Sequence, residues 1–114
     1  MSGREWIINR AKMSSGERRT RSQLAQLLSQ RGVIRGTLLE RRRVCGSPNC
    51  KCTRGEGHDS LYLVINEKGR TRQLFIPKDW EARVRQWVAD YHQARELMEA
   101  VSRLYWDKVR QRRD

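Results

Sequence analysis

The sequence lacks any apolar run long enough to cross a membrane, and little of it can form a hydrophobic core. Only 37% of its 114 residues are hydrophobic, and the mean hydropathy is -0.90. A membrane-spanning helix needs about 20 apolar residues, and a signal peptide needs a shorter apolar segment near the N-terminus. Because neither pattern is present, we expect a single small cytoplasmic domain without a membrane span. Such a chain buries a modest core, which a structural metal ion can supplement.

The sequence also lacks the residue patterns of common catalytic and nucleotide-binding sites. No nucleophile with a general base, carboxylate pair, glycine-rich phosphate loop or zinc-deaminase pattern stands out. Helix-turn-helix, aromatic RNA-binding and classical zinc-finger patterns are absent as well. We therefore predict that the protein is not an enzyme and takes no small-molecule substrate.

All three cysteines of the chain lie close to a histidine, in a segment rich in turn-forming residues. The odd number of cysteines, without a secretory signal, favours reduced thiols over disulfides. Three thiolates and one imidazole supply the four ligands of a closed tetrahedral zinc site. The predicted Zn2+ ligands are Cys45, Cys50, Cys52 and His58. Free thiols are one alternative, and a redox pair at Cys50 and Cys52 is another, although their spacing is not that of thioredoxin-like motifs.

Positive charge is in large excess. The chain has 25 Lys+Arg against 13 Asp+Glu, a net charge of +12, and most of its cations are arginine, which binds phosphate bidentately and stacks on bases. This composition predicts a polyanionic partner, with DNA or RNA favoured and an acidic protein surface as the alternative. The residues expected to contact nucleic acid are Arg41, Arg42, Arg43, Lys51, Arg54, Arg70 and Arg72. Tyr62, Phe75 and Trp80 could stack on unpaired bases, but we expect them to build the small core.

The order of periodic segments predicts an α+β fold with a small three-stranded antiparallel sheet, a zinc loop, a short N-terminal helix and a long C-terminal amphipathic helix. Residues 1–16 are expected to form a partly disordered basic arm, and residues 17–114 a single zinc-loop domain. The first helix is predicted over 17–31, with a capping box at Ser14-Ser15-Gly16-Glu17 and a stop at Gly32. The sheet and metal loop occupy 36–76, and the last two strands form a hairpin with a bulge.

The long helix is predicted over 78–112, with Asp79 as its N-cap. Its apolar residues recur in alternating steps of three and four, the heptad spacing of a coiled coil. Either the N-terminal helix or the same helix of a second subunit is expected to cover this stripe. The predicted partner or dimer interface consists of Val84, Trp87, Tyr91, Met98, Val101 and Tyr105.

Several short motifs occur in a fixed order along the middle of the chain. They are Arg35-Gly36-Thr37-Leu38-Leu39-Glu40-Arg41, Cys45-Gly46-Ser47-Pro48-Asn49-Cys50-Lys51-Cys52, Gly55-Glu56-Gly57-His58, Ile76-Pro77 and Val84-Arg85-Gln86-Trp87-Val88-Ala89-Asp90-Tyr91. In these motifs the chain resembles an uncharacterised prokaryotic family, known as a domain of unknown function with a zinc-loop motif. The chain departs from the family pattern at Asp59-Ser60-Leu61. The resemblance implies a small metal-loop protein, often encoded near mobile elements, and no established activity.

Together, the metal-ligand cluster and the charge predict a zinc-stabilised, nucleic-acid-binding accessory protein. It would act as a dimer or as a subunit of a mobile-element or defence nucleoprotein complex. The alternative is a protein-binding adaptor or inhibitor that docks on a nuclease or transposase through its long helix.

Overall fold

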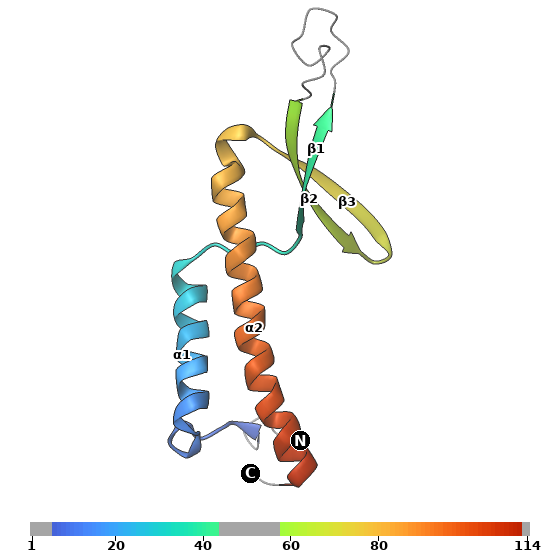
Figure 1. The fold of residues 1–114 in the computed structure, drawn as a ribbon. Helices are drawn as coiled ribbons and strands as arrows, with labels where there is room; N and C mark the ends of the chain where they lie inside the picture. Colours follow the sequence, from blue (N-terminus) through green and yellow to red (C-terminus); the bar gives the residue numbers. More distant parts are fainter. Residues whose placement is uncertain (1–5, 44–57, 113–114) are drawn as a thin grey trace, which may run out of the picture. The chain divides into compact units, whose positions relative to one another are not determined.

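The computed structural model of the protein describes residues 6–43 and 58–112, with the backbone only for Arg43 and His58. The helices and strands, in chain order, are a 3-10 helix at Arg10–Lys12, α1 at Ser15–Gln30, β1 at Thr37–Arg43, β2 at His58–Glu67, β3 at Arg70–Ile76, a 3-10 helix at Lys78–Trp80 and α2 at Glu81–Gln111 (Figure 1). The predicted α+β class is confirmed, with its three-stranded antiparallel sheet, short N-terminal helix and long C-terminal helix. Among the described helices, none combines the length and the apolar character that a membrane crossing requires.

The chain forms two compact units. One consists of Gly32–Tyr91 and contains the sheet together with the first part of α2; we call it the sheet unit. The other consists of Met1–Arg31 and His92–Asp114 and contains α1 together with the second part of α2; we call it the helical unit.

The core of the sheet unit lies between one face of the sheet and α2. The strand order is β1-β2-β3, and both pairs of neighbouring strands are antiparallel. Alternate side chains of a strand point to opposite faces, so Leu61 and Leu63 of β2 share one face. These two residues are buried with Ile76 of β3 and with Val84 and Val88 of α2. We call this side of the sheet the inner face and the opposite side the outer face.

The hairpin between β2 and β3 has a two-residue turn. Glu67 pairs with Arg70, which leaves Lys68 and Gly69 between the strands. Their φ angles are 53° and 78°, and positive φ at both central residues is the mark of a type I′ turn. The twist of this turn matches that of the flanking strands, so no extra residue is needed. The predicted bulge is therefore wrong.

Gly32, the predicted stop of the first helix, follows α1 closely but does not act as a left-handed cap. The helix ends at Gln30, its C-cap is Arg31, and Gly32 is not among the described residues with positive φ. Instead, the indole of Trp87 lies directly over it: a Cβ at Gly32 would be 2.6 Å from Trp87 Nε1. Because the space for a side chain is already filled, close approach explains this glycine.

The start of the long helix differs from the prediction. Asp79 lies inside the 3-10 helix Lys78–Trp80, and α2 begins only at Glu81. The N-cap of the 3-10 helix is Pro77, which makes no side-chain cap hydrogen bond, while the backbone N–H of Trp80 donates to the Pro77 carbonyl at 2.9 Å. The prediction that Asp79 is the N-cap of the long helix is therefore wrong.

Candidate nucleic-acid interface

The inner face of the sheet carries the acidic side chains of the strands. Glu40 accepts a hydrogen bond from Arg85 of α2, and Arg42 Nε lies 3.7 Å from Asp59 Oδ1. The third acid, Glu67, is the direct cross-strand partner of Arg70. By strand alternation all three acids lie on the face that contains Leu61 and Leu63. Each acid on this face thus stands beside an arginine.

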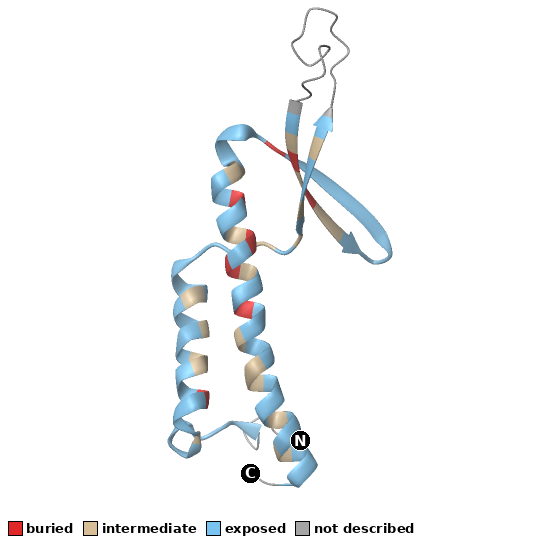
Figure 2. Ribbon diagram, in the orientation of Figure 1, coloured by how far each residue is buried: buried red, intermediate tan, exposed pale blue. Residues whose placement is uncertain are grey.

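The outer face of the sheet carries an apolar and aromatic row across all three strands. Leu39, Tyr62 and Phe75 are direct neighbours in the register. The rings of Tyr62 and Phe75 meet edge to face, with centroids 5.8 Å apart and planes at 67°. Leu39 is 40% exposed and Phe75 is 53% exposed, so this row presents apolar and aromatic surface to solvent. Figure 2 shows that β3 is exposed along its whole length except at Ile76.

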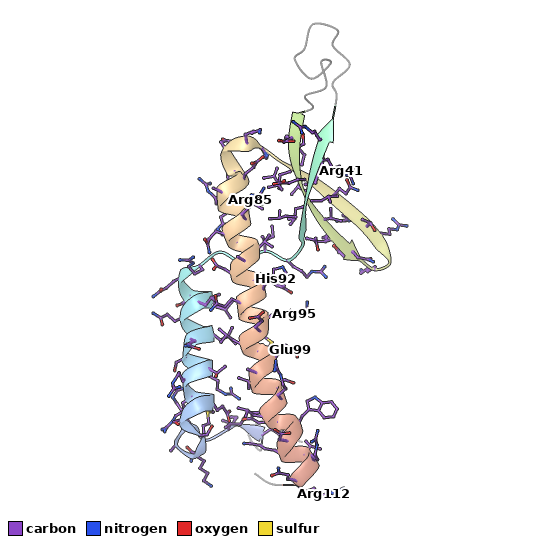
Figure 3. The ribbon with its side chains drawn as sticks, in the orientation of Figure 1. Arg41, Arg85, His92, Arg95, Glu99 and Arg112 are labelled. Carbon is purple, nitrogen blue, oxygen red and sulfur yellow. The ribbon has the colours of Figure 1, made fainter. Side chains whose placement is uncertain are left out.

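A cation adjoins this row. The guanidinium carbon of Arg41 lies 5.2 Å from the centroid of the Tyr62 ring, within the range of a cation–π contact. Figure 3 shows Arg41 on β1 of the sheet. In the described strands, no Asp or Glu shares this face, because all of their acids lie on the inner face. The outer face therefore combines π-surface with a positive charge that no acid of the described strands offsets.

The structure separates the arginines that the sequence suggested as one nucleic-acid-binding set. Arg41 lies on the outer face, whereas Arg42, Arg70 and Arg72 lie on the inner face by strand alternation. The partners of Arg42 and Arg70 on β2 are Asp59 and Glu67. These partners are eight positions apart, which is about 26 Å along the strand, so the two arginines lie near opposite ends of the sheet. The side chain of Arg43 is outside the described structure, as are Lys51 and Arg54.

The three aromatic residues expected in the core lie outside the buried cluster. Tyr62 lies on the face opposite Leu61 and Leu63, and Phe75 is its exposed neighbour. Trp80 is 40% exposed, with Arg83 stacked 4.1 Å from its ring centroid. The expectation that these aromatics build the core is wrong, because the aliphatic residues of β2, β3 and α2 fill it.

The predicted metal ligands Cys45, Cys50 and Cys52 lie outside the described residues, as does the side chain of His58. In the described segments 6–43 and 58–112, no group of three or more metal-binding side chains comes together. The sheet does fix both ends of the ligand-bearing segment, since Arg43 is the direct cross-strand partner of His58. Cys45 follows Arg43 by two residues, and two residues span at most about 7 Å. The length of the chain therefore allows Cys45 to approach the His58 backbone. The covalent geometry is therefore compatible with a shared ion.

In the helical unit, α1 and α2 are joined by a polar cluster. Glu17 is 2% exposed, and its Oε2 accepts hydrogen bonds from Arg21 Nε at 2.9 Å and from the Tyr105 hydroxyl at 2.8 Å. Arg21 also donates to the Tyr105 hydroxyl oxygen at 3.2 Å. Ser14 caps α1 as predicted, since its Oγ accepts from the backbone N–H of Glu17 at 3.1 Å. The carboxylate of the predicted capping box thus reaches across to α2.

This cluster shifts the pKa values of its members. Burial alone raises the pKa of Glu17, but the hydrogen bonds from Tyr105 and Arg21, with the charges of Arg21 and Lys108, outweigh it and lower the pKa. Burial also raises the pKa of Tyr105, and its hydrogen bond to Glu17 adds to that rise. At neutral pH the cluster therefore holds an ionised carboxylate and a neutral phenol.

The residues predicted as a partner interface have different surroundings. Val84 is buried in the core of the sheet unit. Outside that core, Trp87 meets Trp80 edge to face, with ring centroids 6.0 Å apart. The Tyr105 hydroxyl is bonded within the helical unit. Tyr91 and Val101 are half-buried, whereas Met98 is 58% exposed. No partner chain is present, so the interface itself stays a prediction.

Further apolar residues are exposed on the last turns of α2. Trp106 is 69% exposed and Val109 is 73% exposed. In the same unit, the N-terminal residues Trp6, Ile7 and Ile8 line a hollow together with residues near the end of α2. The helical unit thus presents large apolar side chains to solvent.

Comparison with known proteins identifies the family. Residues 15–86 match the family described as a domain of unknown function, DUF6788. Because the match covers more than half of the chain, the protein belongs to this family. No curated protein and no solved structure was found to match the chain. The prediction of an uncharacterised family is confirmed, while the zinc-loop motif and the prokaryotic origin stay predictions.

Proposed function

We propose that the protein is a zinc-stabilised nucleic-acid-binding accessory protein. The observation that carries this proposal is the outer face of the sheet, where Arg41 adjoins exposed aromatic and apolar side chains and no strand carboxylate is present. A polyanion approaching this face meets a cation without an opposing acid. The net charge of +12 favours the same class of partner at longer range.

The zinc part of the proposal is supported by the donor set and by the sheet register. Cys45, Cys50, Cys52 and His58 would hold the ion, which would supply structural stabilisation and no chemistry. The direct pairing of Arg43 with His58 brings the two ends of the ligand segment together in the fold. A zinc ion there would close the end of the β1–β2 pair.

Binding of nucleic acid is expected to weaken steeply with salt. Affinities for random-sequence single-stranded and duplex DNA and RNA would be measured by fluorescence anisotropy at 50 and 200 mM salt. Neutralisation of three phosphates would predict a loss of about 40-fold for a duplex and about 20-fold for a single strand over this range, because each contact releases condensed counterions. An unlabelled neutral polymer serves as a competitor control. The proposal fails if none of the four nucleic acids binds at the lower salt concentration.

The exposed apolar end of α2 favours a second function, an adaptor that docks on a protein such as a nuclease or transposase. Charge alone does not account for Trp106 and Val109 in solvent. Trp106→Glu is expected to release a partner that co-purifies with the tagged protein after nuclease treatment. Gln93→Glu, which also introduces one negative charge but at an exposed position on another side of α2, is expected to retain the partner. Equal retention by both variants would exclude this end of the helix as the docking surface.

A further inference from the structure

We propose that the outer face of the sheet is a stacking platform for unpaired bases of single-stranded nucleic acid. In this arrangement Tyr62 and Phe75 carry bases, and Arg41 neutralises an adjacent phosphate. The inference rests on the proposed function and deepens it. It specifies that the ligand is single-stranded and names the residues that contact its bases and phosphates.

The arrangement of the two rings favours a single strand over a duplex. The rings of Tyr62 and Phe75 come from neighbouring strands, and their planes are inclined by 67°. Two bases placed on them would not be parallel, so the ligand has to turn its bases independently. A flexible single strand allows this, and every base offers a π-face to an aromatic ring. In a duplex those faces are already stacked, and opening a base step costs a few kcal/mol.

The charges around the platform favour a nucleic acid over a protein partner. Arg41 lies beside the Tyr62 ring, and the acids of the described strands lie on the other face of the sheet. The central apolar row is narrow, and the flanking positions of the same face include Ser60, Gln73 and Thr71. Hydroxyl and amide groups at these positions can bond to base edges and phosphate oxygens. An apolar protein surface would leave them unsatisfied.

The first test compares neighbouring residues of β3. Phe75 is 53% exposed on the outer face, and Leu74 is 59% exposed on the inner face. Phe75→Ala is expected to weaken binding of a fluorescent oligo-dT or oligo-U by about 5- to 100-fold, because one stacked base is lost. Leu74→Ala is expected to change affinity by less than about twofold. Phe75→Trp restores a stacking surface and is expected to retain binding. Circular dichroism of each variant checks that the fold is unchanged.

The second test compares neighbouring residues of β1. Arg41→Gln and Arg42→Gln remove the same charge from opposite faces. Arg41→Gln is expected to cause the larger loss of affinity, and this loss should shrink at high salt because it arises from a phosphate contact. The loss caused by Phe75→Ala should be nearly independent of salt, since stacking releases no counterions. The two kinds of contact are thereby distinguished.

Four outcomes separate this inference from the proposed function. Tighter binding of single strands than of duplexes, lost in Phe75→Ala and kept in Leu74→Ala, supports both. If nucleic acid binds but Phe75→Ala and Leu74→Ala behave alike, the platform is overturned while the proposed function stands. Preferential binding of duplexes overturns the platform as well. Without binding to any nucleic acid at low salt, the proposed function itself fails.

Discussion

Removal of the proposed zinc ion is expected to unfold the sheet unit. Its described core contains five buried apolar side chains, from Leu61 to Val88, which is a small core for a unit of this length. Structural zinc sites contribute an apparent free energy of about 10–16 kcal/mol, whereas whole domains have a stability of about 5–15 kcal/mol. Chelation should therefore abolish cooperative unfolding of the sheet. Metal content by mass spectrometry and thermal unfolding by circular dichroism, before and after chelation, measure this.

A pair of variants within the ligand segment sharpens this experiment. Cys52→Ser removes one predicted ligand and is expected to lower both zinc content and thermal stability. Lys51→Ser alters the adjacent residue without removing a ligand and should leave zinc content unchanged. Protein purified without chelators that contains no stoichiometric metal, and unfolds at the same temperature after chelation, would contradict the predicted zinc site.

Replacement of Glu17 is expected to destabilise the helical unit by about 2–3 kcal/mol, because charged hydrogen bonds to Arg21 and Tyr105 are lost together. The loss should be smaller than for a fully buried ion pair, since the Arg21 side chain is 34% exposed and can be rehydrated. Glu17→Gln measures the contribution of the charge, and Tyr105→Phe removes one donor at a cost of about 1 kcal/mol. Urea unfolding of each variant and of the double variant gives the coupling energy.

The effect of Glu17→Gln should depend on pH. The pKa of Glu17 is lower in the folded protein than its ordinary value, so folding favours the ionised carboxylate. Its contribution to stability is fully present above the unfolded pKa of about 4.3 and disappears as pH falls through the folded pKa. The wild-type protein and the variant should therefore differ most near neutral pH and converge in acid. A stability difference that stays constant between pH 7 and pH 3 would exclude this electrostatic role.

Local sequence patterns predicted the elements of the fold well. The β-rich runs gave the strands, and the absence of Gly and Pro after Pro77 gave the long helix. The details that failed depend on contacts between distant residues. The first helix does end just before Gly32, as predicted, but the reason for a glycine there is the close approach of Trp87 and not a left-handed cap. Likewise, the carboxylate of Glu17 is held by Tyr105, a residue 88 positions away, and no local pattern indicates that contact.

Only part of the candidate site could be predicted from the sequence. From the sequence, the arginines were expected to form one nucleic-acid-binding set, and the aromatic residues were expected to build the core. The period of two along β2 by itself separates Leu61 and Leu63 from Tyr62. The pairing of Tyr62 with Phe75 and Leu39 could not be deduced without the register, because it requires three strands to be aligned. Alternation along each strand was the available clue.

Each carboxylate of the described strands lies beside an arginine, and this pairing lowers the number of cations that are available to a ligand. Arg85 and Arg42 lie beside Glu40 and Asp59, so part of their positive charge is offset before any ligand arrives. The number of ions displaced on binding should therefore fall short of the number of arginines in the sheet unit. Because both ion pairs are exposed to solvent, replacing Arg42 or Arg85 is expected to cost less than about 1 kcal/mol of stability, and the fold should be kept.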